Sequence, residues 1–141
     1  MQQLLEFFSN HPFLGTAWLV FALLLVISII QTMTSGSKSL TPLLATQMIN
    51  KQDAQVVDLR AVAEFNKGHI HGSINIPFTK LKDSVKDLEK YKQGPIIMVC
   101  NTGMQSGSAA ILLRKHGFQQ VHKLKGGIQS WSGDNLPLTK G

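Results

Sequence analysis

The sequence predicts an α/β fold, with a mostly parallel central sheet flanked by helices and preceded by one N-terminal transmembrane helix. Three observations support this. Short apolar runs typical of buried strands alternate with segments of helical periodicity. Residues 13–30 carry no charge. The single cysteine, Cys100, lies where an apolar run gives way to a small polar loop and then a helical segment.

The uncharged run 13–30 is long enough to cross a bilayer, because at about 1.5 Å per residue it spans roughly 27 Å. A buried helix and a cleavable signal peptide are the alternatives. A signal peptide needs a positive leading segment and a small-residue cleavage site, whereas no Lys or Arg precedes Lys38. We therefore expect an uncleaved anchor, residues 1–31, with a transmembrane helix over about 13–31.

The distribution of charge predicts how this anchor is oriented. All 14 Lys and Arg residues follow the span, so the positive-inside rule places the C-terminal part in the cytoplasm and the N-terminus outside. This makes the chain a single-pass protein of the inner (cytoplasmic) membrane. A lone cysteine, which can form no intrachain disulfide, suits that reducing compartment.

The basic excess behind the chain's net charge of +6 lies after the anchor, because Glu6 is the one charged residue before the uncharged run. A basic excess beside a membrane can attract anionic headgroups, but the lysines of 80–92 alternate with acidic residues, which favours an ordinary solvated helix face. Nucleic-acid binding has little support, because the basic residues are not interleaved with aromatic ones.

Residues 32–39 are small and polar and predict a flexible linker. A domain over 40–137 and a tail over 138–141 follow. Thr41 and Pro42 predict a helix start, as N-cap and first helical residue. The remaining expected elements are strands at 55–59, 72–77, 96–99 and 121–124, and helices at 61–67, 81–91, 106–116 and from 128 onward.

Cys100 is the candidate nucleophile. Ligand sites of parallel α/β folds lie beyond the carboxyl ends of the strands, where Cys100 is expected. A small-residue loop before a helix can direct several backbone N–H groups at the sulfur, and the helix N-terminus adds partial positive charge. Both favour the thiolate, which is the reactive form. We therefore expect a lowered Cys100 pKa that needs no general base.

A purely structural Cys100 is the alternative, because a free cysteine is often a small buried apolar residue. Its place at a strand–loop–helix junction leaves the two interpretations balanced. The wider sequence pattern has to decide between them.

Segments on both sides of Cys100 form such a pattern. The first comprises Val57-Asp58-Leu59-Arg60, Glu64-Phe65, Gly68-His69-Ile70 and Gly72-Ser73-Ile74-Asn75-Ile76-Pro77, and the last is Leu124-Lys125-Gly126-Gly127 followed by Trp131. In this order and spacing, over about 40–137, they resemble the rhodanese-like family. The family's catalytic cysteine falls on Cys100.

The resemblance implies a sulfurtransferase in which Cys100 takes sulfur from a sulfane donor as a persulfide and passes it to a thiol or protein acceptor. The loop from Cys100 would cradle that persulfide with its backbone N–H groups. We expect no cofactor. The expected substrate-binding loop residues are Asn101, Thr102, Gly103, Met104, Gln105 and Ser106.

Four further signature positions are expected to support the domain, because buried polar groups need partners such as one another. A metal site at His69 and His71 is not expected, since no further ligands lie nearby in the sequence. The supporting positions are Asp58, Arg60, Glu64 and His69.

Two loop positions depart from the family pattern. Gln105 stands where many active members carry Arg, and Asn101 stands where a basic residue is frequent. An anionic donor such as thiosulfate thereby loses a charge-assisted hydrogen bond, worth roughly 1.5 to 3 kcal/mol. We expect weak thiosulfate turnover. The short loop without Arg also disfavours the related phosphatase and arsenate-reductase activities.

Two hypotheses remain. The first is a membrane-anchored sulfurtransferase or sulfur carrier that acts through Cys100, with the bilayer holding its N-terminal helix. The second is a non-catalytic scaffold that binds a partner, such as a membrane protein, at the cytoplasmic membrane face. The retained cysteine favours the first.

Overall fold

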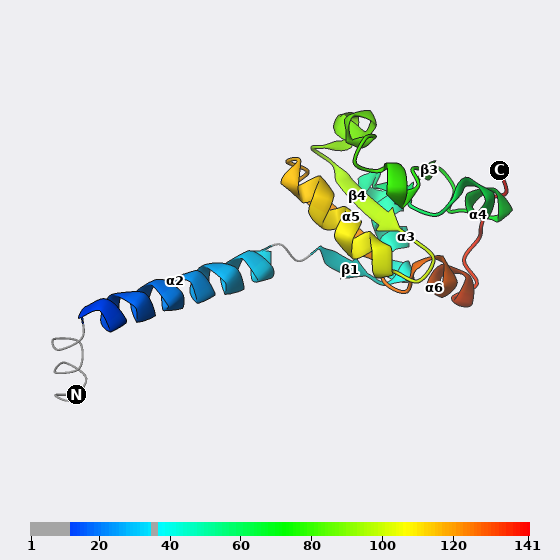
Figure 1. Ribbon diagram of the computed structural model, residues 1–141. Helices are drawn as coiled ribbons and strands as arrows, with labels where there is room; N and C mark the ends of the chain where they lie inside the picture. Colours follow the sequence, from blue (N-terminus) through cyan, green and yellow to red (C-terminus); the bar gives the residue numbers. More distant parts are fainter. Residues whose placement is uncertain (1–11, 35–36) are drawn as a thin grey trace. The chain divides into compact units, whose positions relative to one another are not determined.

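The computed structural model describes residues 12–34 and 37–141, which belong to two units divided between Gly36 and Ser37 (Figure 1). The first unit contains α2, Pro12–Thr34. Its window Pro12–Ile30 has a mean hydropathy of 2.6 and is almost entirely exposed, so the helix is long and apolar enough to cross a membrane. A signal sequence near an N-terminus would have the same properties. Residues 1–11 of the predicted anchor lie outside the described residues.

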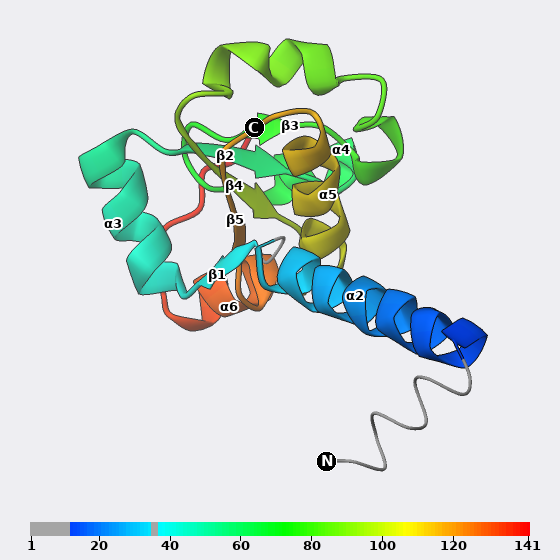
Figure 2. The same ribbon diagram turned by 90° about the vertical axis from the view of Figure 1, so that its left-hand side faces the viewer.

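The second unit is built on a five-stranded parallel sheet in the order β1-β5-β4-β2-β3 (Figure 2). This confirms the predicted α/β fold with helices flanking a parallel sheet. The strands are β1 Lys38–Leu40, β2 Gln55–Asp58, β3 Ile74–Asn75, β4 Pro95–Val99 and β5 Gln120–Leu124. The helices are α3 Pro42–Gln52, α4 Val62–Lys67, α5 Met104–Lys115 and α6 Gly127–Gly133, with 3₁₀ segments η1 Phe78–Lys80 and η2 Val85–Tyr91.

Strand β4 lies at the centre of the sheet and supplies both hydrophobic cores. Ile96 and Met98 pack into the core that α5 and η2 cover, while Ile97 and Val99 pack into the core that α3 and α6 cover. A strand buried on both faces reads as a continuous apolar run. The residues before Cys100 are uniformly apolar because both faces of β4 are buried.

Strand β1 was not predicted, since residues 38 and 39 fell within the expected linker. The strand pairs in parallel with β5, with Lys38 opposite His122 and Leu40 opposite Leu124. Only Leu40 of its three residues is buried. A segment this short has no periodicity of its own, so the pairing with β5 makes it a strand.

The expected helix over 81–91 is a series of turns that ends in the 3₁₀ segment η2. Its apolar spacing was read correctly, because Leu81, Val85 and Leu88 are all buried. Val85, Leu88 and Tyr91 recur at intervals of three, which aligns them on one face of a 3₁₀ helix. The same residues therefore fill the core in a tighter helix than predicted.

Candidate functional site

Cys100 directly follows the carboxyl end of β4, in the turn between β4 and α5. Figure 1 shows these two elements. The helix begins at Met104, two residues earlier than predicted. Gly103 makes this entry possible, because its φ of 93° is a left-handed conformation that suits glycine. Met104, Gln105 and Ser106 therefore form the first turn of α5, and Cys100 to Gly103 form the bend before it.

The Cys100 sulfur has one hydrogen-bonding neighbour in this bend, Gly103, and one in the first turn of α5, Ser106. The Gly103 backbone N–H donates to Sγ at 3.0 Å. The Ser106 hydroxyl oxygen lies 3.7 Å from Sγ and donates to the Gly103 carbonyl oxygen at 2.9 Å. The Ser106 hydroxyl hydrogen thus has two acceptors within reach, the carbonyl oxygen and the sulfur.

The pKa of the Cys100 thiol is lowered by this environment. Burial raises the pKa, because it disfavours the charged thiolate. The Ser106 hydroxyl and the backbone N–H groups of Ser106, Gln105 and Gly103 lower it, and together they outweigh the effect of burial. The direction of this shift agrees with the lowered Cys100 pKa expected from the sequence.

The loop side chains differ sharply in exposure. Cys100 is only 2% exposed and Ser106 is fully buried. Asn101 and Thr102 in the bend and Met104 and Gln105 at the start of α5 are exposed. None of these four carries a positive charge, so the bend itself offers an anion backbone N–H groups and neutral side chains.

Helix α6 holds this bend from the side of β5. The Ile128 N–H donates to the Cys100 carbonyl oxygen at 2.9 Å, and the Gln129 N–H donates to the Asn101 carbonyl oxygen at 3.2 Å. Gly127 has a φ of 61°, and a Cβ atom there would overlap the Cys100 carbonyl oxygen and lie 2.6 Å from the Asn101 carbonyl carbon. Only glycine allows this close approach.

The contact between Gly127 and the bend was not predicted from the sequence, where the Gly126-Gly127 pair entered only as part of the last segment of the family pattern. The pair also lies against the other end of the bend. A Cβ atom on Gly103 would lie 3.2 Å from the Gly126 nitrogen. The β5–α6 junction therefore fixes the path of the chain around the thiol.

Asp58 and Arg60 form a buried ion pair at the carboxyl end of β2. Arg60 Nη2 donates to Asp58 Oδ2 at 2.7 Å and to the Gly68 carbonyl oxygen at 2.7 Å, and Arg60 Nε donates to both Asp58 oxygens. The Asn75 side-chain amide donates to the carbonyl oxygens of Asp58 and Arg60. This network ties β2, β3 and the end of α4 together.

The other two predicted supporting residues lie apart from that network. The His69 ring is hydrogen-bonded through Nδ1 to the Phe65 carbonyl oxygen at 2.9 Å and stacks on the Phe65 ring. Its backbone pairs with Thr139, so the C-terminal segment returns to the domain. Glu64 is exposed and pairs with Lys67 at 2.8 Å, on the surface of α4. Asp58, Arg60 and His69 are therefore buried, whereas Glu64 is not.

No cluster of three or more potential metal-ligating His, Cys, Asp or Glu side chains occurs among residues 12–34 and 37–141.

A thiol at the carboxyl edge of a parallel sheet, with backbone N–H groups directed at it from a helix N-terminus, is in an environment typical of reactive cysteines. The rhodanese-like domain family matches residues 41–134. The chain is 44% identical to the uncharacterized protein YibN of Escherichia coli (strain K12), over 100% of this chain and 99% of that protein. The chain belongs to the rhodanese-like family.

Two further comparisons agree with this assignment. Thiosulfate sulfurtransferase GlpE of Shewanella oneidensis is 33% identical over 69% of this chain and 94% of its own length. The crystal structure of a rhodanese-related protein from Thermoplasma volcanium superposes with a TM-score of 0.66 at 29% identity, over 72% of this chain and 97% of that one. The similarity to both proteins covers most of the domain that contains Cys100.

Proposed function

We propose that the chain is a membrane-anchored sulfurtransferase or sulfur carrier that acts through a persulfide on Cys100. The observation that carries the proposal is the environment of the sulfur, where Gly103 and Ser106 favour the thiolate without a general base. Membership of the rhodanese-like family and the similarity to a thiosulfate sulfurtransferase support it.

The reaction has two nucleophilic steps. The Cys100 thiolate attacks the outer sulfur of a sulfane donor, an S–S bond forms on Cys100, and the donor leaves with the electron pair of the broken bond. An acceptor thiolate then attacks the outer sulfur of the Cys100 persulfide. The acceptor becomes the persulfide, and Cys100 leaves as the thiolate. No net oxidant or reductant is needed.

The chain's own residues supply the stabilisation that these steps need. The backbone N–H groups of Gly103, Gln105 and Ser106 stabilise negative charge at the site. The first turn of α5 adds the positive end of the helix dipole. Because Gln105 and Asn101 are neutral, we propose a thiol or protein donor in preference to a small dianion such as thiosulfate.

Mass spectrometry of the full chain after exposure to sulfane donors tests the proposal. We expect one added sulfur atom on Cys100 that is removed by an acceptor thiol. Cys100→Ser is the matched control and should gain none. Absence of any sulfur adduct on Cys100 with either thiosulfate or a persulfide donor would sink the proposal.

We also propose that α2 is an uncleaved anchor, with the N-terminus outside and the C-terminal domain in the cytoplasm. Its apolar composition and the position of every Lys and Arg after residue 37 support this. Intact-mass analysis of the membrane-extracted protein distinguishes an anchor from a cleaved signal. Labelling of Cys100 by an impermeant maleimide should require disruption of the inner membrane, and labelling of intact spheroplasts would contradict the orientation.

A non-catalytic scaffold is the second candidate. The low exposure of Cys100 and the absence of a cation in the bend favour it. The two functions differ in their sensitivity to mutation. Loss of the cellular role in Cys100→Ser rejects the scaffold, whereas a role that survives Cys100→Ser but not deletion of residues 1–31 rejects the enzyme.

A further inference from the structure

The outer face of α5 carries an exposed stripe that begins beside the nucleophile. Met104, Ser108, Ile111 and Lys115 recur at helical spacing, so they lie on one side of the helix. Met104 is 85% exposed and Ile111 is 46% exposed. Eleven residue steps at about 1.5 Å each make the stripe roughly 16 Å long. A surface of this length suits a segment of a protein better than a small molecule.

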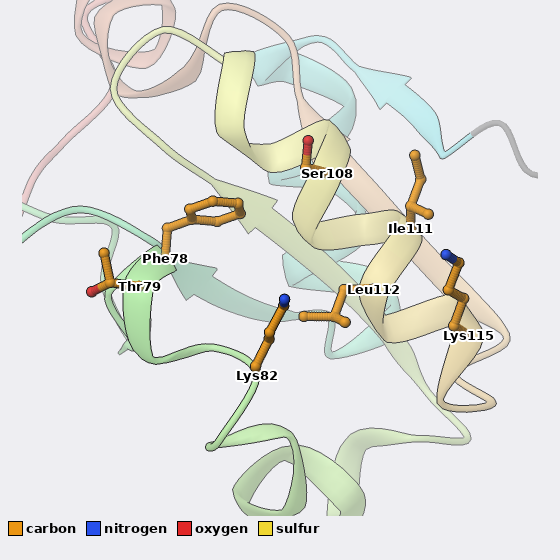
Figure 3. Close-up of a pocket in the computed structure, with 7 residues that line it drawn as sticks. All are labelled: Phe78, Thr79, Lys82, Ser108, Ile111, Leu112 and Lys115. Carbon is orange, nitrogen blue, oxygen red and sulfur yellow. The ribbon is translucent and has the colours of Figure 1, made fainter.

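A groove of about 440 Å³ lies between this stripe and η1. Figure 3 shows that the Phe78 ring points from η1 toward α5, and that the Lys82 side chain extends between Phe78 and Leu112. The groove combines the apolar side chains of Phe78, Ile111 and Leu112 with the basic side chains of Lys82 and Lys115. The residues that form it include Phe78, Lys82, Ser108, Ile111, Leu112 and Lys115.

The charges around the groove have one sign. No acidic side chain lines it, and within residues 12–34 and 37–141 neither Lys82 nor Lys115 belongs to an ion pair. Asp83 and Glu89 share a neighbouring hollow with Lys82, but neither lines the groove. Within the groove, two ammonium groups border apolar side chains, which is complementary to an apolar group flanked by carboxylates.

We propose that this groove and the α5 stripe dock an acidic amphipathic segment of a protein partner. An apolar side chain of the partner packs against Phe78 and Leu112, and its carboxylates meet Lys82 and Lys115. Met104 supplies an adaptable apolar contact at the end of the stripe nearest Cys100. The inference rests on the proposed function in one respect: the docked protein is the sulfur donor or acceptor.

The position of the two lysines supports a protein partner. Both border the groove, which does not include the Cys100 bend, where Asn101 and Gln105 supply no charge. Because the lining of the groove does not include residues 100–105, the two lysines do not supply the charge that the bend lacks. They can orient a partner whose reactive sulfur lies several residues from its acidic segment.

Fluorescence anisotropy of the full chain in detergent tests this docking surface. The probe is a fluorescein-labelled helical peptide with a leucine face bordered by glutamates, and its counterpart has lysine in place of each glutamate. We expect the acidic peptide to bind about tenfold more tightly than the basic one. The double variant Lys82→Glu/Lys115→Glu should reverse this preference.

Matched controls separate the groove from the overall charge and hydrophobicity of the chain. Lys51→Glu changes an exposed lysine on α3, on the other face of the sheet, and should leave the preference intact. Ile111→Ala should weaken binding of the acidic peptide. Leu43 is also an exposed apolar residue, and Leu43→Ala should leave that binding unchanged.

Three results would overturn the proposal. The first is equal binding of both peptides, and the second is a preference that Lys82→Glu/Lys115→Glu leaves unchanged. The third is displacement of the acidic peptide by phosphatidylglycerol vesicles that bind the wild type but not Lys82→Glu/Lys115→Glu. Transfer of sulfur from thiosulfate to Cys100 does not use the groove. A chain that binds the peptide but gains no sulfur would therefore reject the proposed function and leave the docking surface standing.

Discussion

Replacing Gly127 with alanine should damage both the stability of the domain and the reactivity of Cys100. Two costs add at this position. The left-handed φ of 61° costs a residue with a Cβ atom about 1 to 2 kcal/mol. Overlap of that Cβ with the Cys100 carbonyl oxygen forces α6 and the bend apart, which by analogy with overpacked cores costs about 1 to 3 kcal/mol. We expect a loss of about 2 to 5 kcal/mol of unfolding free energy.

Two other glycines separate these contributions. Gly72 also has a left-handed φ, 74°, but a Cβ atom there meets nothing within 4 Å. Gly72→Ala should therefore lose only the free energy of the left-handed conformation, about 1 to 2 kcal/mol. Gly133 ends α6 with open space around it. Gly133→Ala should be neutral or stabilising by up to about 1 kcal/mol.

The measurements are urea unfolding of the full chain in detergent, followed by Trp131 fluorescence, and the iodoacetamide rate of Cys100. Trp131 is buried in the domain core, and Trp18 on α2 lies outside the domain. Gly127→Ala should lower the rate at which Cys100 reacts with iodoacetamide, because the added Cβ atom overlaps the backbone of Cys100 itself. If Gly127→Ala is no more harmful than Gly72→Ala in both assays, the close packing of α6 on the bend does not matter.

Four further predictions concern single side chains. Asp58→Asn leaves the buried Arg60 charge unpaired and should cost about 3 to 5 kcal/mol in urea unfolding, whereas Glu64→Gln on the surface should leave the midpoint unchanged. Ser106→Ala removes a donor that lowers the Cys100 pKa, so the midpoint of the iodoacetamide rate against pH should rise. In the wild type that midpoint should lie below the value of the urea-unfolded chain, about 8.5. Because folding lowers the Cys100 pKa, the thiolate stabilises the folded state. This stabilisation is complete above the pKa of the unfolded chain and is lost as the pH falls through the pKa of the folded chain. Gln105→Arg should raise kcat/KM for thiosulfate about 10- to 100-fold.

Each of these predictions has a contradicting outcome. Equal costs of Asp58→Asn and Glu64→Gln would mean that the buried ion pair does not stabilise the fold. An unchanged pH midpoint in Ser106→Ala would remove the hydroxyl from the activation of the thiol. Thiosulfate turnover that is already high in the wild type, or unaffected by Gln105→Arg, would show that the bend does not lack a cation.

The sequence predicted most elements of the fold because their signals are local. The apolar run 96–99 indicated a strand, and β4, Pro95–Val99, is a strand that packs into a hydrophobic core on each face of the sheet. The element at 81–91 had the right buried positions but the wrong helix type, since residues three apart fit both an α-helical face and a 3₁₀ face. Strand β1 was missed, because its three residues acquire a strand conformation only by pairing with β5.

The site was predictable to the same extent. The bend at Cys100 follows from a strand, small residues and a helix in succession, and its effect on the thiol pKa follows from the direction of the backbone N–H groups. Glu64 and Asp58 looked alike in the sequence, yet one is exposed on α4 and the other is buried beside Arg60. Burial depends on which surface the rest of the chain covers, and a local pattern does not contain that information.

The sequence by itself determined the alternation of strands and helices, the apolar N-terminal helix and the identity of the candidate nucleophile. The tertiary structure decided what surrounds that nucleophile. Parallel strands bring their carboxyl ends to one edge of the sheet, so Gly127 from the β5–α6 junction meets the carbonyl of Cys100, twenty-seven residues earlier in the chain. The same packing places Phe78 and Lys82 beside α5. These contacts join residues that are distant in the sequence, and only the folded chain brings them together.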